Sequence, residues 1–288
     1  MGMLPSPEER IQQLQGELSP KQARLARFIL ENKYFVSVAS AQQVGDEVGV
    51  SAATVVRLAQ RLGYDGFTEL QEALRQEFPR YLTTVERTRQ RLASPLPSDD
   101  VPAQVFRTDI QNIERTAQNL APEHLDAVVE EIARASNILV VGGGLSAAPA
   151  TFLVHSLKVM GFNVRGAFGG GMDVAAEVAQ LDQNTLVIAI DVWRYLRTTV
   201  QALTTAHKRG ARTIAITDSA LSPLAQAADY TFEVATEGVA HSLSPTAIIA
   251  LINVIIARLS FHLPEKTMEA LQRVDEAYRE NHLLIVEG

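Results

Sequence analysis

Apolar residues recur at spacings of three and four along the chain up to about residue 92. This spacing is the period of an amphipathic α-helix, and no alternating run is long enough there to predict a half-buried strand. The pattern therefore predicts an all-helical N-terminal domain. Its clearest helices are residues 20–32, 41–48 and 52–62.

Beyond residue 102, short continuous apolar runs alternate with helical stretches. Continuous apolar runs are expected for parallel strands that are buried on both faces. The alternation predicts an α/β domain built on a doubly wound parallel sheet. The predicted strands are residues 137–141, 162–166, 185–190, 213–217 and 230–234, and the predicted helices are 147–160, 172–180, 196–209, 221–227, 245–259 and 264–282.

Residues 93–102 read ASPLPSDDVP, with three prolines, two serines and two aspartates. This composition cannot continue a helix and offers little core material. We therefore predict a helical domain at 1–92, a linker at 93–102 and an α/β domain at 103–288.

Charge and composition narrow the class of protein. The chain up to Ala93 has 12 Lys and Arg against 11 Asp and Glu, whereas the remainder has 14 against 22, which indicates two domains with different partners. The absence of cysteine excludes disulfides, thiolate metal sites and cysteine nucleophiles. With no signal-peptide pattern and no apolar run of roughly 20 residues, we expect a cytoplasmic protein without a membrane partner.

The N-terminal domain contains a helix-turn-helix pattern. Ser19, Ser40 and Ser51 stand at predicted N-caps, and Gly49 stands where a helix ends. Two short helices joined by Gly49-Val50-Ser51 match the motif whose second helix enters the major groove.

At 100° per residue, Val55, Leu58 and Leu62 share the inner face of that second helix, and Arg57 lies opposite. Arginine can read guanine or hold phosphate, although a solvated helix surface would also explain the arginines. The predicted DNA-contacting residues are Ser51, Ala53, Thr54, Arg57, Gln60 and Arg61.

Residues 49–74, GVSAATVVRLAQRLGYDGFTELQEAL, closely resemble the helix-turn-helix of the RpiR family of bacterial transcriptional regulators. In that family a sugar isomerase (SIS) domain follows, and the stretch KRGARTIAITDSALSPLAQAADYTFEV is similar to that domain. The resemblance implies an operator-binding protein with a phosphosugar-binding domain that works as a homodimer or homotetramer. The matching positions in the first segment are Gly49, Ser51, Thr54, Val55, Arg57, Leu62, Gly63, Gly66, Phe67 and Leu70.

Three glycines, Gly142, Gly143 and Gly144, end the first predicted strand and open a helix. Backbone amides and the helix dipole at such a place can hold an anion, and Ser146 adds a hydroxyl. The spacing is not GxGxxG and no acid ends the next strand, which argues against a dinucleotide. A tight glycine turn with a capping serine is the alternative.

The second phosphate loop of the family resembles SxSGxT, but here the corresponding residues read DVWRYLRTT. Either Arg194 and Arg197 supply the positive charge while Trp193 and Tyr195 contact a ligand ring, or the pocket has degenerated and this stretch packs against a partner subunit. Ser242 precedes the helix 245–259, whose N-terminus could close the site. The predicted ligand-binding residues are Gly143, Gly144, Ser146, Asp191, Arg194, Tyr195, Arg197 and Ser242.

Together these features predict a transcriptional regulator whose operator affinity is modulated by an anionic carbohydrate-related ligand, a sugar phosphate being the expected class. The alternatives are a sugar-phosphate isomerase with an appended helical module, with Glu177 or Glu237 as the general base, and a protein-binding adaptor. We expect no catalytic residue, metal or cofactor, because GxSxG and HExxH are absent from the sequence.

Overall fold

The computed structural model describes residues 6–14, 16–76, 85, 88–89, 91, 100–283 and 285. The chain forms two compact units, Met1–Arg87 and Thr88–Gly288. Most of the predicted linker, residues 93–99, lies outside the described residues, and its last residues already begin a helix at Val101.

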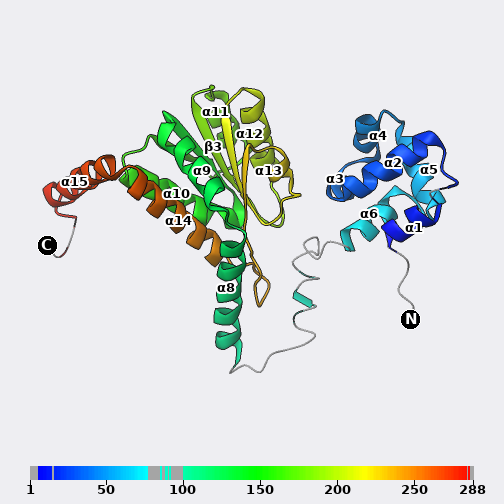
Figure 1. Cartoon of the computed structure of the whole chain (residues 1–288), viewed down its shortest axis with the longest axis horizontal. Helices are drawn as coiled ribbons and strands as arrows, with labels where there is room; N and C mark the ends of the chain where they lie inside the picture. The colour runs from blue at the N-terminus through cyan, green and yellow to red at the C-terminus, as the bar shows by residue number, and fades with distance from the viewer. Residues whose placement is uncertain are drawn as a thin grey trace. The chain divides into compact units, whose positions relative to one another are not determined.

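All the regular secondary structure described in the first unit is helical, as the sequence predicts (Figure 1). Its core is one cluster of buried side chains in which Leu25, Ile29, Leu58 and Leu70 are fully enclosed. Its helices are α1 (Pro7–Leu14), α2 (Pro20–Glu31), α3 (Lys33–Val38), α4 (Ala41–Val48), α5 (Ala52–Arg61) and α6 (Phe67–Gln76).

The predicted helix ends of this unit are confirmed. Ser19 and Ser40 each form a capping box with the glutamine three residues on, so that two free backbone amides are satisfied at each helix start. Ser51 accepts a hydrogen bond from the backbone N–H of Thr54 at 3.3 Å. Gly49 takes a left-handed conformation with φ 70°, which glycine adopts without the steric strain that a side chain would add.

The second unit is built on a five-stranded parallel sheet in the order β2-β1-β3-β4-β5, which confirms the doubly wound prediction. The predicted strand at 162–166 begins later, because the N–H of Phe162 instead donates to the carbonyl of Leu157 and closes the preceding helix. The strands are β1 (Asn137–Val141), β2 (Val164–Ala167), β3 (Thr185–Ile190), β4 (Arg212–Thr217) and β5 (Tyr230–Glu233).

Helices cover both faces of this sheet (Figure 1). Alternate strand residues point to opposite faces, so Ile138 and Val140 join one core cluster while Leu139 and Val141 join the other. The two helices before β1 were not predicted. The helices are α8 (Val101–Gln118), α9 (Pro122–Arg134), α10 (Ala147–Val159), α11 (Gly171–Ala179), α12 (Arg197–Lys208), α13 (Pro223–Gln226), α14 (Thr246–His262) and α15 (Pro264–Glu280).

Among the described helices, none alone has the length and apolar character of a membrane span. The helices α14 and α15 satisfy both criteria only as a pair, and they meet at a bend of 107°.

Candidate DNA-binding surface and ligand site

The helix α5 presents the predicted face to solvent. Val55 and Leu58 are fully buried and Leu62 is nearly so, whereas Arg57 and Gln60 are exposed. Ala53 and Arg61 are also exposed, and Thr54 is half-buried. The helical-wheel assignment is therefore confirmed for the inner face and for the exposed one.

Close packing between α4 and α5 depends on Gly45. A Cβ atom at this position would lie 2.5 Å from the carbonyl oxygen of Val50, in the turn between the two helices. That separation is well inside van der Waals contact and involves backbone, which cannot rotate away. Gly45 thus allows the turn to lie against α4 and sets the angle at which α5 leaves it.

The two arginines of α5 have different surroundings. Arg57 makes no hydrogen bond or ion pair with any residue that the structure describes. The guanidinium of Arg61 donates to the carbonyl oxygen of Glu17 at 2.8 Å and to Oε1 of Gln22 at 3.1 Å. Arg57 therefore has its full donor set available for a ligand, whereas Arg61 is held against the rest of the unit.

The candidate ligand site lies where β1 and β3 end side by side. In the order β2-β1-β3-β4-β5, the chain leaves β1 and β3 in opposite directions, and such a switch point opens a crevice at the carboxyl ends of the strands. The glycine run follows β1, and residues 191–196 follow β3. The two loops touch, because a Cβ on Gly143 would lie 2.4 Å from Cδ1 of Leu196.

The glycines have separate structural roles. Gly142 is enclosed, since its Cβ would lie 2.9 Å from Cβ of Ala150 and 3.0 Å from the carbonyl oxygen of Ser146. Gly144 has φ 55°, which favours glycine. It begins a 3₁₀ turn, Gly144–Ser146, rather than the α-helix itself. Ser146 is 2% exposed and its side chain makes no cap hydrogen bond, so the alternative is wrong about the serine cap, although the tight glycine turn that it expected is present.

The loop after β3 contains a strained turn. Trp193 has φ 67°, and the N–H of Arg194 donates to the carbonyl oxygen of Val192 at 2.9 Å. A three-residue turn with a positive φ at its centre is rare, and for a bulky side chain it costs of order 1 to 3 kcal/mol. The Trp193 ring packs against the core, and the guanidinium carbon of Arg194 lies 5.4 Å from its centroid.

Two buried carboxylates hold this loop. Oδ2 of Asp191 accepts the backbone N–H of Leu196 at 2.7 Å, and Oδ1 of Asp218 accepts the hydroxyl of Tyr195 at 2.6 Å. Burial raises the pKa of Asp191 to about 7. The hydrogen bonds from Leu196 and Thr199 lower that pKa in part, and the negative charge of Asp218 raises it. The loop is thereby fixed in its strained form.

The predicted ligand-binding residues divide into two groups. Gly143, Gly144 and the exposed Arg194 and Arg197 all lie at the switch-point edge of the sheet. Asp191, Tyr195 and Ser146 lie there too, but Asp191 and Ser146 are buried and the Tyr195 hydroxyl bonds Asp218.

Ser242 lies in the loop that follows β5, and its hydroxyl donates to the carbonyl oxygen of Leu243 at 3.1 Å. The strands β3 and β4 separate β5 from β1, so the sheet order does not bring Ser242 next to the glycine loop.

Three residues of this site were missed: Leu196, Thr199 and Asp218. Asp218 follows β4 directly, and carboxyl ends of neighbouring parallel strands meet at one edge of a sheet, so its position after an apolar run was an available signal. Leu196 and Thr199 gave no such signal, because an apolar residue and a buried threonine are ordinary features of a helix start.

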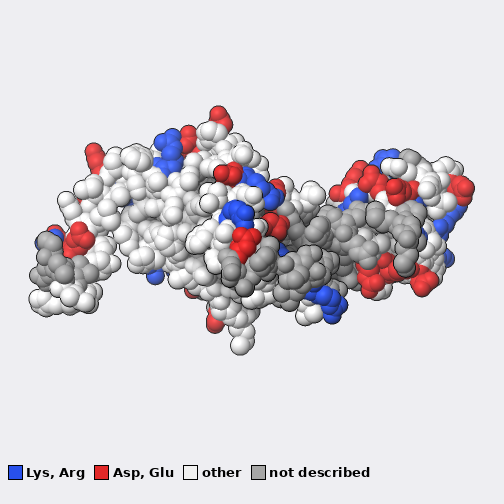
Figure 2. All heavy atoms as spheres, turned by 90° about the horizontal axis from the view of Figure 1, so that it is seen from below, with Lys and Arg blue, Asp and Glu red and all other residues white. Residues whose placement is uncertain are grey.

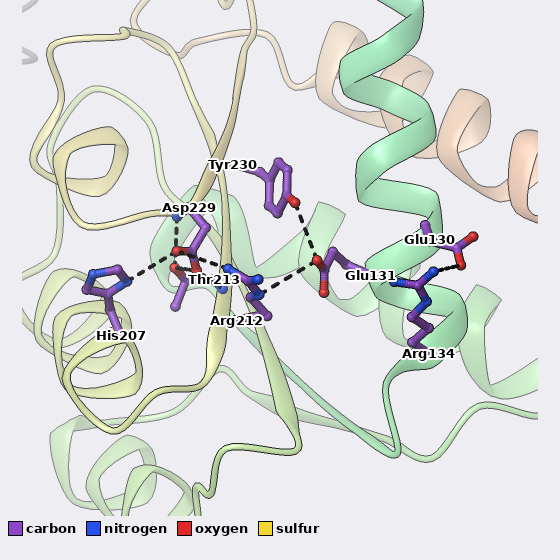
Figure 3. Close-up of polar contacts among 8 residues, drawn as sticks. All are labelled: Glu130, Glu131, Arg134, His207, Arg212, Thr213, Asp229 and Tyr230. Carbon is purple, nitrogen blue, oxygen red and sulfur yellow. Dashed lines mark hydrogen bonds and ion pairs between the residues drawn. The ribbon is translucent and has the colours of Figure 1, made fainter.

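A polar network lies at the opposite, amino end of the strands (Figure 3). Arg212 lies 3.7 Å from Glu131 and 3.8 Å from Asp229, and Arg134 lies 2.5 Å from Glu130. A groove of about 200 Å³ adjoins these residues. Each arginine here already faces a carboxylate, so the network ties α9 to the sheet and is a poor anion site.

The carboxylates of the isomerase alternative are engaged elsewhere. Oε2 of Glu177 lies 3.1 Å from Nε of Arg165 on β2, and Oε2 of Glu237 lies 3.6 Å from the guanidinium of Arg91. On the face shown in Figure 2, acidic and basic side chains are interspersed and uncharged ones cover most of the second unit.

Comparisons with known proteins agree with both units. Residues 6–80 match the family described as helix-turn-helix domain, rpiR family, and residues 131–261 match the SIS domain family. The sugar isomerase domain of an RpiR transcription factor from Sphaerobacter thermophilus is 43% identical, with a TM-score of 0.60 over 62% of this chain and 99% of that one.

Two further structures share the fold. The Vibrio vulnificus NanR protein complexed with ManNAc-6P is 21% identical, with a TM-score of 0.62 over 96% of this chain and 98% of that one. The E. coli CFT073 protein c3406 in complex with A5P is 19% identical, with a TM-score of 0.50 over 62% of this chain and 99% of that one.

Proposed function

We propose, from the premise that this chain belongs to the RpiR family of transcriptional regulators, that it binds operator DNA through α5. A sugar phosphate bound in the SIS domain raises or lowers the affinity for that operator. The observation that carries this proposal is that the chain has both features: an exposed Arg57 that makes no hydrogen bond or ion pair with the described residues, and, in the other unit, a strained loop with two exposed arginines at the switch point.

The DNA contact is proposed to centre on Arg57. Its guanidinium is exposed on the helix that enters the major groove in this motif, and Ala53 beside it leaves room for close approach. Gln60 and Arg61 extend the same surface, and Ser51 and Thr54 lie at its N-terminal end. A homodimer would place two such helices on paired half-sites.

The ligand is proposed to bind between the glycine loop and the loop after β3. Gly143 and Gly144 offer backbone amides, and Arg194 and Arg197 supply positive charge at the same edge. Relatives of the same fold hold ManNAc-6P and A5P, which supports a phosphorylated sugar as the ligand class. Ligand-dependent displacement of the strained loop would alter the placement of the two DNA-binding units, for which a coupling of about 1 to 3 kcal/mol suffices.

The protein is proposed to act in the cytoplasm and without catalysing isomerisation. An aldose–ketose isomerase needs a carboxylate free to act as a base beside the sugar. The two acids that the sequence suggested, Glu177 and Glu237, are both ion-paired. Turnover of a sugar phosphate that is lost on replacing either acid would contradict this part of the proposal.

The test is a titration of labelled DNA from upstream of the gene and its neighbours with the purified full chain. The titration is repeated at several salt concentrations, and then with ManNAc-6P, A5P and other sugar phosphates. Selective, saturable binding that one compound shifts at least about fivefold is the expected result. Binding that is indifferent to DNA sequence would contradict the regulator proposal, whereas selective binding that no compound shifts would contradict the ligand.

The two arginines of the loop provide a sharper test. The Arg194→Ala and Arg197→Ala double variant should lose the ligand-induced shift and keep its ligand-free operator affinity, because both side chains are exposed and belong to the second unit. Lys208→Ala, which removes an exposed positive charge at the opposite end of α12, is the control. A normal ligand response in the double variant would show that the anion binds elsewhere.

A further inference from the structure

The helix α8 is attached to its domain by polar side chains. The side-chain amide of Asn112, 1% exposed, donates to the backbone carbonyl of Glu237 at 2.7 Å, and its Oδ1 accepts the Glu237 N–H at 3.1 Å. The hydroxyl of Thr116, 7% exposed, accepts the N–H of Ala235 at 2.9 Å. The inner face of α8 is therefore held against the loop after β5 by hydrogen bonds.

The outer face of the same helix is apolar. Phe106 is 70% exposed, Ile110 55% and Ile113 37%, and Ala103 and Ala117 are exposed as well. We call these five residues the outer seam. Their spacing of three, four, three and four is the heptad repeat by which helices pack against one another.

The outer seam lies opposite the buried face. At 100° per residue, its five members fall within one narrow stripe. Asn112 lies about 160° around the helix from Ile110, the middle member of the seam. A surface helix normally turns its apolar stripe inward and its polar residues outward. The reversal in α8 indicates that the stripe is a docking surface, since contiguous apolar surface of this kind is unfavourable in water.

We propose that a second copy of this chain covers the outer seam with its own α8, in antiparallel orientation. This rests on the dimer of the proposed function and names the surface that forms it. An antiparallel pair whose axis passes between Ile110 and Ile113 stacks Ile110 on the partner's Ile113 and Phe106 on the partner's Ala117. The two central layers are then identical isoleucine pairs, and in each outer layer the large Phe106 meets a small alanine, so the seam is complementary to itself.

Flanking charges select the antiparallel orientation. Arg107 and Glu114 occupy equivalent positions on one edge of the seam, one heptad apart, and both are exposed. In the antiparallel pair Arg107 faces the partner's Glu114, and the two-fold axis repeats the contact. A parallel pair would instead bring Asp109 near the partner's Glu114, which places like charges together.

Sedimentation equilibrium of the full chain tests the surface. The Phe106→Glu and Ile110→Glu double variant should raise the dimer dissociation constant at least about a hundredfold, because it places four carboxylates in the seam. Phe261→Glu, at a phenylalanine of α14 that is 82% exposed, is the control and should leave the dimer unchanged. Circular dichroism checks that each variant folds.

A charge exchange tests the orientation. Within one chain Arg107 is ion-paired with Asp100 at 3.1 Å, so the exchange is made in an Asp100→Asn background. There Glu114→Arg sets arginines opposite each other and should weaken the dimer about fivefold, and adding Arg107→Glu should restore it. Weakening by the double exchange as well would overturn the antiparallel pair.

The cysteine-free chain allows a direct test of register. Phe106→Cys and Ala117→Cys variants, mixed and mildly oxidised, should form a covalent heterodimer, because a disulfide needs Cα atoms within about 7 Å. Each variant alone should crosslink poorly, since its two cysteines lie about 16 Å apart along the helices. Efficient crosslinking of Phe106→Cys with itself would overturn the register.

The outcomes separate this proposal from the proposed function. A dimeric wild type whose dimer survives the double glutamate variant contradicts the α8 surface alone. A monomeric wild type that binds its operator selectively contradicts the dimer and the α8 surface, while DNA recognition stands. Loss of the dimer only in Phe261→Glu would assign the interface to α14.

Discussion

Asp191 is a buried acid whose pKa of about 7 leaves it partly protonated at neutral pH. Its native pKa lies above the value near 3.9 that an unfolded chain gives to an aspartate. The native state therefore binds more protons than the unfolded state between about pH 4 and pH 7. The free energy of unfolding falls as pH rises through this window, and the loss is complete above about pH 7.

Replacing Asp191 by asparagine should remove this penalty. Asp191→Asn keeps an acceptor for the N–H of Leu196, and we expect it to raise the free energy of unfolding at pH 8 by up to about 4 kcal/mol. At pH 4 the variant and the wild type should differ little. Urea unfolding at both pH values measures this, and an equal change at the two would show that the effect is not electrostatic.

Arg57 is the residue on which DNA recognition is proposed to depend. Arg57→Ala should weaken operator binding by about 1 to 3 kcal/mol if the guanidinium contacts a base edge. Thermal stability should change little, because Arg57 is exposed and makes no hydrogen bond or ion pair with the described residues. Fluorescence anisotropy with labelled operator measures the loss, Arg279→Ala on α15 is the exposed control, and unchanged affinity would remove Arg57 from the contact set.

At the scale of elements, two adjacent glycines of the loop after β1 have different structural roles. Gly142 faces Cβ of Ala150 and backbone atoms, which have no freedom to move, whereas Gly143 faces only the end of the Leu196 side chain. The first glycine is thus required for packing of α10 on the sheet. The second determines how closely the loop after β3 approaches.

The two glycines should therefore respond differently to the same substitution. Gly142→Ala should lower the free energy of unfolding by about 1 to 3 kcal/mol through overpacking. Gly143→Ala should cost less than about 1 kcal/mol, because Leu196 can rotate away, but it should change the ligand response. Chemical denaturation and operator titration are the two readouts, and equal destabilisation by both variants would contradict the assignment.

At the scale of the whole molecule, the chain has separate hydrophobic cores in two compact units. We expect two unfolding transitions in differential scanning calorimetry. A bound sugar phosphate should raise only the transition of the SIS unit, since a ligand stabilises the state that binds it. A single transition that shifts as one would show that the two units unfold together.

The sequence by itself determined the two-unit organisation, the parallel sheet and the inner and outer faces of α5. These follow from local rules: apolar spacing reports which face is buried, serine and glycine report helix ends, and continuous apolar runs report strands covered on both sides. Every one of the predicted strands is present, and Val55, Leu58 and Leu62 are buried as predicted.

The tertiary structure alone decided which of these residues meet. Leu196 lies over Gly143 and Tyr195 bonds Asp218 because the order of parallel strands brings loops distant in sequence to one edge, and spacing along the chain does not encode that order. The role of α8 was hidden for a related reason. An apolar stripe on a surface helix normally faces the core, and only the packing of Asn112 and Thr116 shows that this one points outward.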